Sequence, residues 1–277
     1  MIPLLYDDFL RAALREDLGR AGDLTSEAIV PETAAGVAQA VARASGIVSG
    51  VAPFARVFQL IDEEIAATVN VDDGDEVVAG TVIAELHGSL RSILAAERTA
   101  LNILTHLCGV ATATRRLVDA VAGTRAAIID TRKTTPGMRA LEKAAVRHGG
   151  GQNHRFGLDD AILIKDNHVA IAGSIASAVR AARRRAGHLV KIEVEVDSLD
   201  QLDEALTERA DIILLDNFSI EQTRLAVERT AGRALLESSG HIDEATVRAV
   251  AETGVDLISS GALTHSVRIL DIGLDIT

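Results

Sequence analysis

Aromatic residues are scarce in this chain of 277 residues: they make up 2% of it, with no tryptophan, one tyrosine and five phenylalanines. Hydrophobic residues still reach 48%, so the core must consist of alanine, valine, leucine and isoleucine. That mixture, together with 22 glycines, favours helices packed on parallel strands over an all-β sandwich. A chain of this length can bury a substantial core, either as one large barrel or as two modest domains.

Cysteine and long apolar runs are also nearly absent. Cys108 is the only cysteine, which excludes a disulfide framework and a thiolate metal cluster. No apolar run approaches the roughly 20 residues of a membrane span. Charges begin at Asp7 and Asp8, which argues against a signal peptide. We therefore expect a soluble cytoplasmic protein.

Positive charge is in short supply. The chain has 28 lysines and arginines against 40 acids, with a net charge of −12 and a pI near 5.1. Nucleic-acid binding needs a broad basic face, so this balance argues against it. No lysine precedes Lys133. Part of the strand-rich segment 37–88 resembles biotinyl and lipoyl carriers, but these need a lysine on a turn, so a carrier role is excluded.

The scarce cations gather in residues 128–168. This stretch has seven lysines and arginines against five acids, three of the eight histidines, and three successive glycines. Such a concentration in an acidic chain is typical of a site for a small, multiply anionic ligand. Arg139, Lys143 and Arg147, spaced by four, are equally typical of a solvated helix face.

Arg132, Lys133 and Lys165 have a different setting, because each closely follows or ends an apolar, strand-like run. Barrel strands deliver side chains to the open end of a barrel in this way.

The first part of the chain predicts a domain that mixes helices and strands. Residues 4–18 have Leu5, Phe9, Ala12 and Ala13 at helical spacing, and Gly19 ends this helix. Asp23 lies in a turn and can cap the segment after it. Residues 37–88 predict a small sandwich of short strands, serving as a lid or a dimerisation surface. Residues 90–122 predict a long helix. We place an N-terminal α/β sandwich domain at residues 1–109.

After residue 123 apolar strands alternate with helices, which predicts a parallel sheet with right-handed crossovers. A GxGxxG motif after the first strand is missing, which argues against a dinucleotide-binding sheet. Polar residues at or near the strand ends favour a closed or nearly closed barrel over residues 110–266, with the tail 267–277 returning to the first domain. The expected strands are 126–130, 161–165, 190–196, 211–216, 233–238 and 255–260.

The strand ends carry acids and glycine-containing turns. Glu193 and Glu195 alternate along one strand, so they face the same side, and Asp216 ends the next strand. Turns at residues 238–240 and 259–262 follow the last two strands and lead into possible helical sequence. The last two strands of a barrel, with backbone amides at a helix start, are the common place for a phosphate.

Several of these motifs resemble those of the quinolinate phosphoribosyltransferases, the decarboxylating enzymes of NAD biosynthesis. The shared motifs are EDLGRAGDLTS, DTRKTTPG, EKxAVRxGGGxNHRxGLxDxxLIKDNH, EVEV, LLDNF and GVDxISxGALTHS. Their order and spacing match over nearly the whole chain. The resemblance implies an incomplete β/α barrel with fewer than eight strands. The chain departs from the family at His241, where glycine or asparagine is usual after Ser239 and Gly240, and at Ser260, where a small apolar residue is usual.

The resemblance implies transfer of phosphoribosyl from phosphoribosyl pyrophosphate to the ring nitrogen of quinolinate. Pyrophosphate leaves, the carboxylate next to the nitrogen departs as CO₂, and nicotinate mononucleotide remains. Lys133, Lys165, Glu195 and Asp216 are the implied catalytic residues. Glu195 and Asp216 would meet the ribose hydroxyls and Mg²⁺, which prefers a few carboxylates together with substrate phosphates.

The resemblance also implies how the two substrates are held. Lys133 would bind the pyrophosphate, and the 5′-phosphate would lie in the two glycine-containing turns, at Ser239, Gly240, Ser259 and Gly261. The quinolinate carboxylates need clustered cationic partners. These would be Arg132, His154, Arg155 and Lys165, with Arg98 supplied by the other subunit of a homodimer or larger oligomer.

Three alternatives stay open. One is a paralogue from molybdenum-transport operons, which shares the DTRKT and KDNH motifs. Another is a relative that uses nicotinate and needs one carboxylate site fewer. The third is a non-catalytic, phosphate-binding scaffold, which is disfavoured because the acidic pair and the cationic cluster are both complete.

Overall fold

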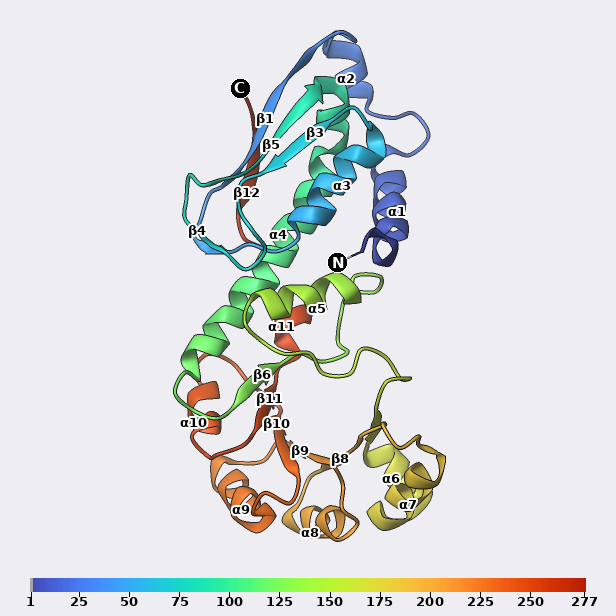
Figure 1. The fold of residues 1–277 in the computed structure, drawn as a ribbon, viewed down its shortest axis with the longest axis vertical. Helices are drawn as coiled ribbons and strands as arrows, with labels where there is room; N and C mark the ends of the chain where they lie inside the picture. Colours follow the sequence, from blue (N-terminus) through green and yellow to red (C-terminus); the bar gives the residue numbers. More distant parts are fainter. Residues whose placement is uncertain (1) are drawn as a thin grey trace. The chain divides into compact units, whose positions relative to one another are not determined.

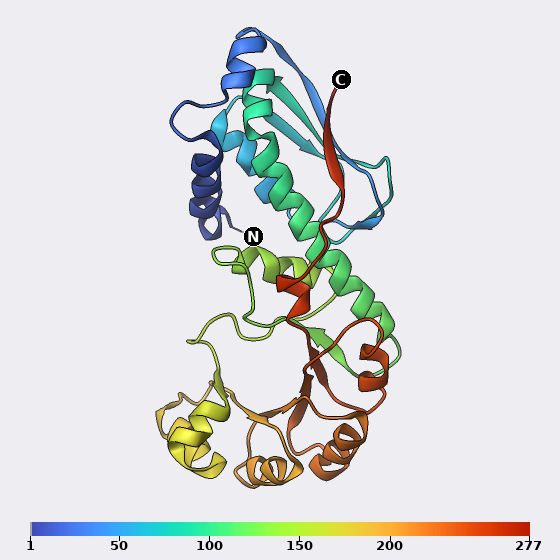
Figure 2. The same cartoon turned by 180° about the vertical axis from the view of Figure 1, so that it is seen from behind.

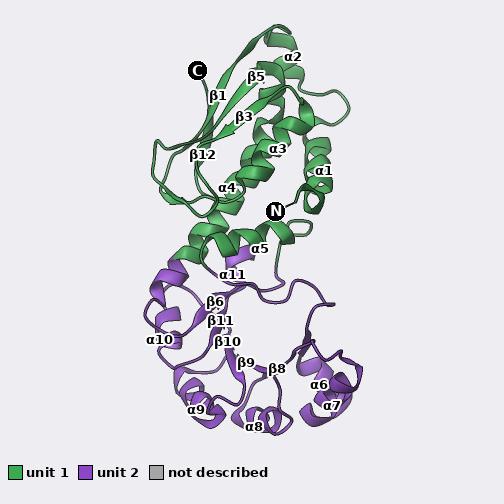
Figure 3. Cartoon of the chain, in the orientation of Figure 1, with its two compact units in different colours: residues 1–115, 134–150, 266–277 green, residues 116–133, 151–265 purple. Residues whose placement is uncertain are grey.

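The computed structural model describes residues 2–277, which form two compact units (Figure 3). Unit 1 comprises residues 2–115, Thr134–Gly150 and Ser266–Thr277, and unit 2 comprises Arg116–Lys133 and Gly151–His265.

The units differ from the predicted division at 109 in two places. Residues 110–115 of the helix α4 (Leu90–Ala120) stay in unit 1, where Val110 and Ala111 belong to the hydrophobic cluster. The helix α5 (Arg139–His148) also lies in unit 1, because Leu141, Ala145 and Val146 belong to the hydrophobic cluster of that unit.

Unit 1 is built on an antiparallel sheet in the order β12-β1-β5-β3. These strands are β1 (Ala35–Ala42), β3 (Ala66–Val69), β5 (Val82–Ser89) and β12 (Ile272–Ile276). A separate ladder joins β2 (Gly46–Ile47) and β4 (Glu76–Val77). The segment 37–88 is therefore not a sandwich of facing strands; the sheet packs on helices instead. The C-terminal strand β12 pairs with β1, from Ala38 opposite Ile276 to Ala42 opposite Ile272.

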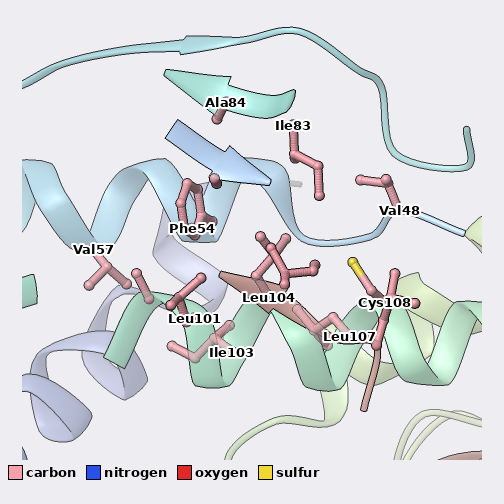
Figure 4. Packing of buried hydrophobic residues seen from close by; sticks show 14 of the residues in the cluster. Val48, Phe54, Val57, Ile83, Ala84, Leu101, Ile103, Leu104, Leu107 and Cys108 are labelled. Atoms are coloured by element: carbon pink, nitrogen blue, oxygen red, sulfur yellow. The ribbon is translucent and has the colours of Figure 1, made fainter. Parts of the chain in front are cut away.

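The core of unit 1 lies between this sheet and the helices α3 (Val51–Ile61) and α4. Figure 4 shows Phe54 of α3, Ile83 of β5, and Leu101 and Leu104 of α4 packed together. Alanines at alternate positions of β1 leave room for these larger side chains.

The remaining helices of unit 1 are η1 (Pro3–Leu5), α1 (Asp7–Leu18) and α2 (Leu24–Ile29). Gly19 ends α1 as predicted, but the buried residues are Leu10 and Leu14, and Leu5 is 56% exposed. The buried face of α1 therefore lies one position further along the helix than the sequence pattern predicts. Asp23 caps α2 by accepting hydrogen bonds from the backbone N–H groups of Thr25 and Ser26.

Unit 2 contains a parallel sheet in the order β6-β11-β10-β9-β8-β7. The first strand lies beside the last, and in the described part of the chain β6 and β7 share no ladder, so the barrel stays incomplete. This confirms the expected α/β class, with a β/α barrel of fewer than eight strands. The strands are β6 (Ala127–Ile129), β7 (Ile162–Ile164), β8 (Ile192–Val196), β9 (Ile212–Asp216), β10 (Leu235–Ser239) and β11 (Leu257–Ser259).

Helices lie on the outer side of this sheet, as both views of the ribbon show (Figures 1 and 2). They are α6 (Asp166–Ala172), α7 (Ile175–Arg185), α8 (Leu199–Thr207), α9 (Ile220–Thr230) and α10 (Val247–Ala251), with the short α11 (Ala262–His265) after β11. Among residues 2–277, none of the helices is long and apolar enough to cross a bilayer. Because the strands are parallel, their carboxyl ends meet at one edge of the sheet.

Candidate active site

Two adjoining pockets open at the carboxyl ends of the unit 2 strands. Their volumes are about 290 and 390 Å³, and both are lined by Thr131, Lys133, Asp216, Ser239 and Ser259. Eleven of the twelve predicted site residues line these pockets. They are Arg132, Lys133, His154, Arg155, Lys165, Glu195, Asp216, Ser239, Gly240, Ser259 and Gly261.

Two acids lie at neighbouring strand ends of the first pocket. Glu195 on β8 accepts a hydrogen bond at Oε2 from Lys165 Nζ, at 2.7 Å. Asp216 at the end of β9 accepts one at Oδ2 from the side-chain amide of Asn217, at 3.0 Å. We find no hydrogen bond to Glu195 Oε1 or Asp216 Oδ1 from the residues that the structure describes, so each acid has one oxygen available to a ligand.

The backbone around His154 is held by Asp130, which follows β6 and is fully buried. Its carboxylate accepts from the His154 backbone N–H at 2.8 Å and from the Asn153 side chain at 2.6 Å. His154 Nδ1 accepts the backbone N–H of Arg155 at 2.6 Å, so the ring proton lies on Nε2.

His154 Nε2 faces two carboxylates, Glu193 Oε2 at 3.0 Å and Glu237 Oε2 at 3.7 Å. Both ring nitrogens are therefore engaged by the protein. The sequence predicts His154 as one of several cationic partners of quinolinate. In the structure its ring lies against Glu193 and Glu237 and orients these two acids.

Glu237 lies in the first pocket but is not among the site residues predicted from the sequence. Its side chain is 2% exposed and lies one alternation below Ser239 on β10, so both face the barrel interior. Burial, and then the nearby Glu193, raises the pKa of Glu237 well above its ordinary value. This favours a protonated Glu237. The same alternation that placed Glu193 with Glu195 could have found it.

Two arginines form the cationic wall of the first pocket. Arg155 donates from Nη1 to the carbonyl of Ala161 at 3.0 Å. Burial, followed by the neighbouring Arg132, lowers the pKa of Arg155. Arginine stays charged at neutral pH despite such a shift. The Asp160 carboxylate accepts the backbone N–H groups of Phe156 and Gly157, which fixes the loop after Arg155.

The second pocket is formed by the two predicted turns. Gly240 has a φ of +105°, and a Cβ there would lie 2.1 Å from the Asn217 side-chain oxygen, so this position requires glycine. Gly261 leads directly into α11, whereas the turn after β10 continues as a loop until Val247, which corrects the expectation of a helix there. His241, His265 and Asn217 also line this pocket and were not predicted site residues.

Arg98 is the one predicted site residue that does not line the described pockets. It lies on α4 in unit 1, with its side chain 65% exposed and 3.8 Å from Glu97. Lys143 also belongs to unit 1, where it is buried, as is its neighbour Glu142, whose carboxylate is 2.7 Å from His106 Nε2. The middle of α5 is therefore not a solvated face.

Both parts of the chain match domain models of one protein family. The family model described as "Quinolinate phosphoribosyl transferase, N-terminal domain" matches residues 23–108, and the one for the C-terminal domain matches residues 110–275. The nicotinate-nucleotide pyrophosphorylase [carboxylating] of Mycobacterium leprae is 49% identical, over 97% of this chain and 96% of that protein.

A second relative, the probable nicotinate-nucleotide pyrophosphorylase [carboxylating] of Bacillus subtilis, is 47% identical over 95% of this chain and 90% of its own. Among solved structures, NadC from Streptococcus pyogenes is similar with a TM-score of 0.94 and 43% identity, covering 100% of this chain and 99% of its own. Human nicotinic acid phosphoribosyltransferase is 14% identical, with a TM-score of 0.60, and this likeness shows the fold alone.

Proposed function

This chain belongs to the quinolinate phosphoribosyltransferase family, and we propose that its strand-end site carries out that family's reaction. The chain is a phosphoribosyltransferase of NAD biosynthesis, a pentosyltransferase that transfers phosphoribosyl from phosphoribosyl pyrophosphate to quinolinate. A cytoplasmic location, expected from the sequence, belongs to the same proposal.

The observation that carries the proposal is that one pocket of the site offers cations for carboxylates and the adjoining pocket offers turns for a phosphate. The first pocket offers arginines and a lysine for the two carboxylates of quinolinate, namely Arg132, Arg155 and Lys165. The second offers turns with buried serines for a phosphate. Lys133 lines both pockets, so one cation reaches the point at which pyrophosphate leaves.

Glu195 and Asp216 fit a magnesium ion by their chemistry. Both offer hard oxygen ligands in the first pocket, and each has one oxygen not engaged in a hydrogen bond to a described residue. Mg²⁺ is usually bound by one or two carboxylates, with waters and substrate phosphates in its other positions. Bound there with the donor, it would supply positive charge to the departing pyrophosphate.

The protein's own contribution to the reaction is position and charge. Attack of the ring nitrogen on ribose C1 passes through a transition state with positive charge on the ribose. The carboxylates of Glu195 and Asp216 stabilise that charge, while the cationic wall holds quinolinate for attack. Once the nitrogen is alkylated, the ring is a pyridinium, so the electron pair of the breaking bond stays on the ring carbon next to the nitrogen as CO₂ leaves. That carbon then takes a proton from water, and no further cofactor is needed.

We propose in addition that Arg98 completes the site of a partner subunit in a homodimer or larger oligomer. Its side chain is exposed and contacts Glu97 of its own chain at 3.8 Å, which leaves the guanidinium available for this role. The test is to mix two inactive variants, Arg98→Ala and Lys165→Ala, and let the subunits exchange.

A heterodimer of these variants has one site that lacks both residues and one wild-type site. Random exchange makes about half the dimers heterodimers, so roughly a quarter of wild-type activity should return. A mixture that stays inactive after exchange has been demonstrated would show that each site is built within one chain.

The reaction itself is tested by measuring pyrophosphate and CO₂ with purified protein, Mg²⁺ and the donor. We expect equal amounts of both products, and only when quinolinate is present. Pyrophosphate release with nicotinate alone would favour the nicotinate-using relative. Donor binding without product from either acid would favour the molybdenum-associated paralogue or a scaffold.

A further inference from the structure

His241 has a left-handed backbone conformation, which asparagine, aspartate and histidine adopt more often than other side chains do. Its φ is +53°, in the left-handed region, directly after Gly240. Glycine and asparagine tolerate this region more readily, and these are the residues usual at this position in the family that the sequence resembles.

The proton on the His241 ring can be assigned from its neighbours. The Asn217 side-chain nitrogen donates to Asp216 Oδ2 at 3.0 Å, and a carboxylate only accepts, so the amide orientation is fixed. The Asn217 oxygen then lies 3.3 Å from His241 Nδ1. Nδ1 must therefore carry a proton in order to donate to that oxygen.

This assignment decides what Nε2 can do. In the neutral ring, with the proton on Nδ1, Nε2 has a lone pair and would repel a phosphate oxygen. In the charged ring, Nε2 carries a proton and becomes a donor, and such charge-assisted bonds are the stronger kind. His241 lines the second pocket together with Gly240 and Gly261, beside the place proposed for the 5′-phosphate.

We propose that His241 donates from Nε2 to the 5′-phosphate of the donor as an imidazolium, so that donor binding takes up a proton. The inference rests on the proposed function, because it takes the phosphoribosyl donor as the occupant of this pocket. It adds a charge-assisted contact, and a pH dependence of donor affinity, that neither glycine nor asparagine at this position can provide.

Charged and titratable groups of both signs lie near the ring. Lys133 and His265 line the same pocket and disfavour a further positive charge, while Asp216 favours it. Asp243, on the same loop, has its pKa lowered mainly by hydrogen bonds from Thr246, with a smaller contribution from His241, so it also faces the ring as an anion. A bound phosphate adds up to two negative charges, which favours the imidazolium form that can donate to it.

The experiment is calorimetric titration of the full-length protein with ribose 5-phosphate, in pairs of buffers of different ionisation enthalpy. Wild type is compared with His241→Asn, which tolerates the same backbone conformation. At pH 7.5 wild type should take up more protons per bound ligand than the variant. At pH 6.5 the variant should bind roughly tenfold more weakly, as expected for loss of one charge-assisted hydrogen bond. By pH 9, where an imidazole is neutral, the two affinities should converge.

His188→Asn is the matched control, since His188 is exposed and lies before β8, at the opposite ends of the strands. It should match wild type in affinity and proton uptake. A second variant, His241→Gly, should repeat the result of His241→Asn.

Equal proton uptake and equal affinity in wild type and both His241 variants would overturn the inference while the proposed function stands, provided that wild type binds ribose 5-phosphate and turns over quinolinate. Wild type that does neither would overturn both.

Discussion

The replacement of Glu237 by glutamine tests whether a protonated acid lies under the site. Glutamine has nearly the same size and shape but carries no charge. The ligand atoms of His154, Glu193 and Glu237 lie within 4.8 Å of one another. Two ionised carboxylates at that separation would repel by roughly 3 kcal/mol at an effective dielectric constant of about 20. Burial, and after it this repulsion, raises the pKa of Glu237.

The sign of the pH effect follows from that direction. Because the pKa of Glu237 is higher in the folded protein than its ordinary value of 4.5, folding retains a proton that the unfolded chain has lost. The stability that the Glu237 proton contributes is therefore fully present below about pH 4.5. It falls by up to about 1.4 kcal/mol per pH unit as the pH rises towards the folded-state pKa of Glu237. Glu237→Gln has no such loss.

We expect the two proteins to be equally stable near pH 4.5, and the variant to become the more stable of the two as the pH rises to 8. The assay is thermal unfolding from pH 4.5 to 8.5. Glu252→Gln is the control, because Glu252 is half exposed and pairs with Arg248 on the surface, so its effect should stay within about 0.5 kcal/mol. A Glu237→Gln variant less stable than wild type at pH 8 would refute the reasoning, since it would mean that the folded protein uses an ionised Glu237.

Three further predictions concern single residues. Asp216→Asn should fold normally but lower kcat by roughly 100-fold or more, because it weakens the contacts to ribose and metal in the transition state, and unchanged turnover at saturating Mg²⁺ would remove Asp216 from the site. Arg155→Lys keeps the charge but loses the planar fork, so it should raise the KM for quinolinate more than the KM for the donor; equal effects on both would speak against a quinolinate contact. Burial raises the pKa of Cys108 to about 12, so its thiol should resist alkylation at pH 8 until the protein is unfolded, and stoichiometric labelling of the native protein would contradict its burial.

The barrel strands could be predicted from sequence because each is a short apolar run followed by a turn or helix signal. Their alternation with helices indicated the parallel arrangement, and parallel strands bring their carboxyl ends together. Residues as distant as Lys165, Glu195 and Asp216 could therefore be placed in one pocket without knowing any contact between them.

The features that sequence reasoning missed depend on contacts between distant elements. The charged spacing of α5 suggested a solvated face, but Glu142 is buried because His106, on α4, supplies a partner 36 residues away. The orientation of the His154 ring likewise depends on acids from two other strands, Glu193 and Glu237. No local pattern records such pairings.

A crystal structure with quinolinate bound tests the central claim most directly. A different pocket of about 390 Å³ lies at the opposite, amino ends of the strands, where Arg125 and Lys191 are among its lining residues. Quinolinate could therefore bind at either end of the strands. We predict quinolinate in the strand-end pocket, with its two carboxylates against Arg132 and Arg155. Quinolinate bound only at the amino ends, with the strand-end pocket empty at saturating ligand, would contradict this claim.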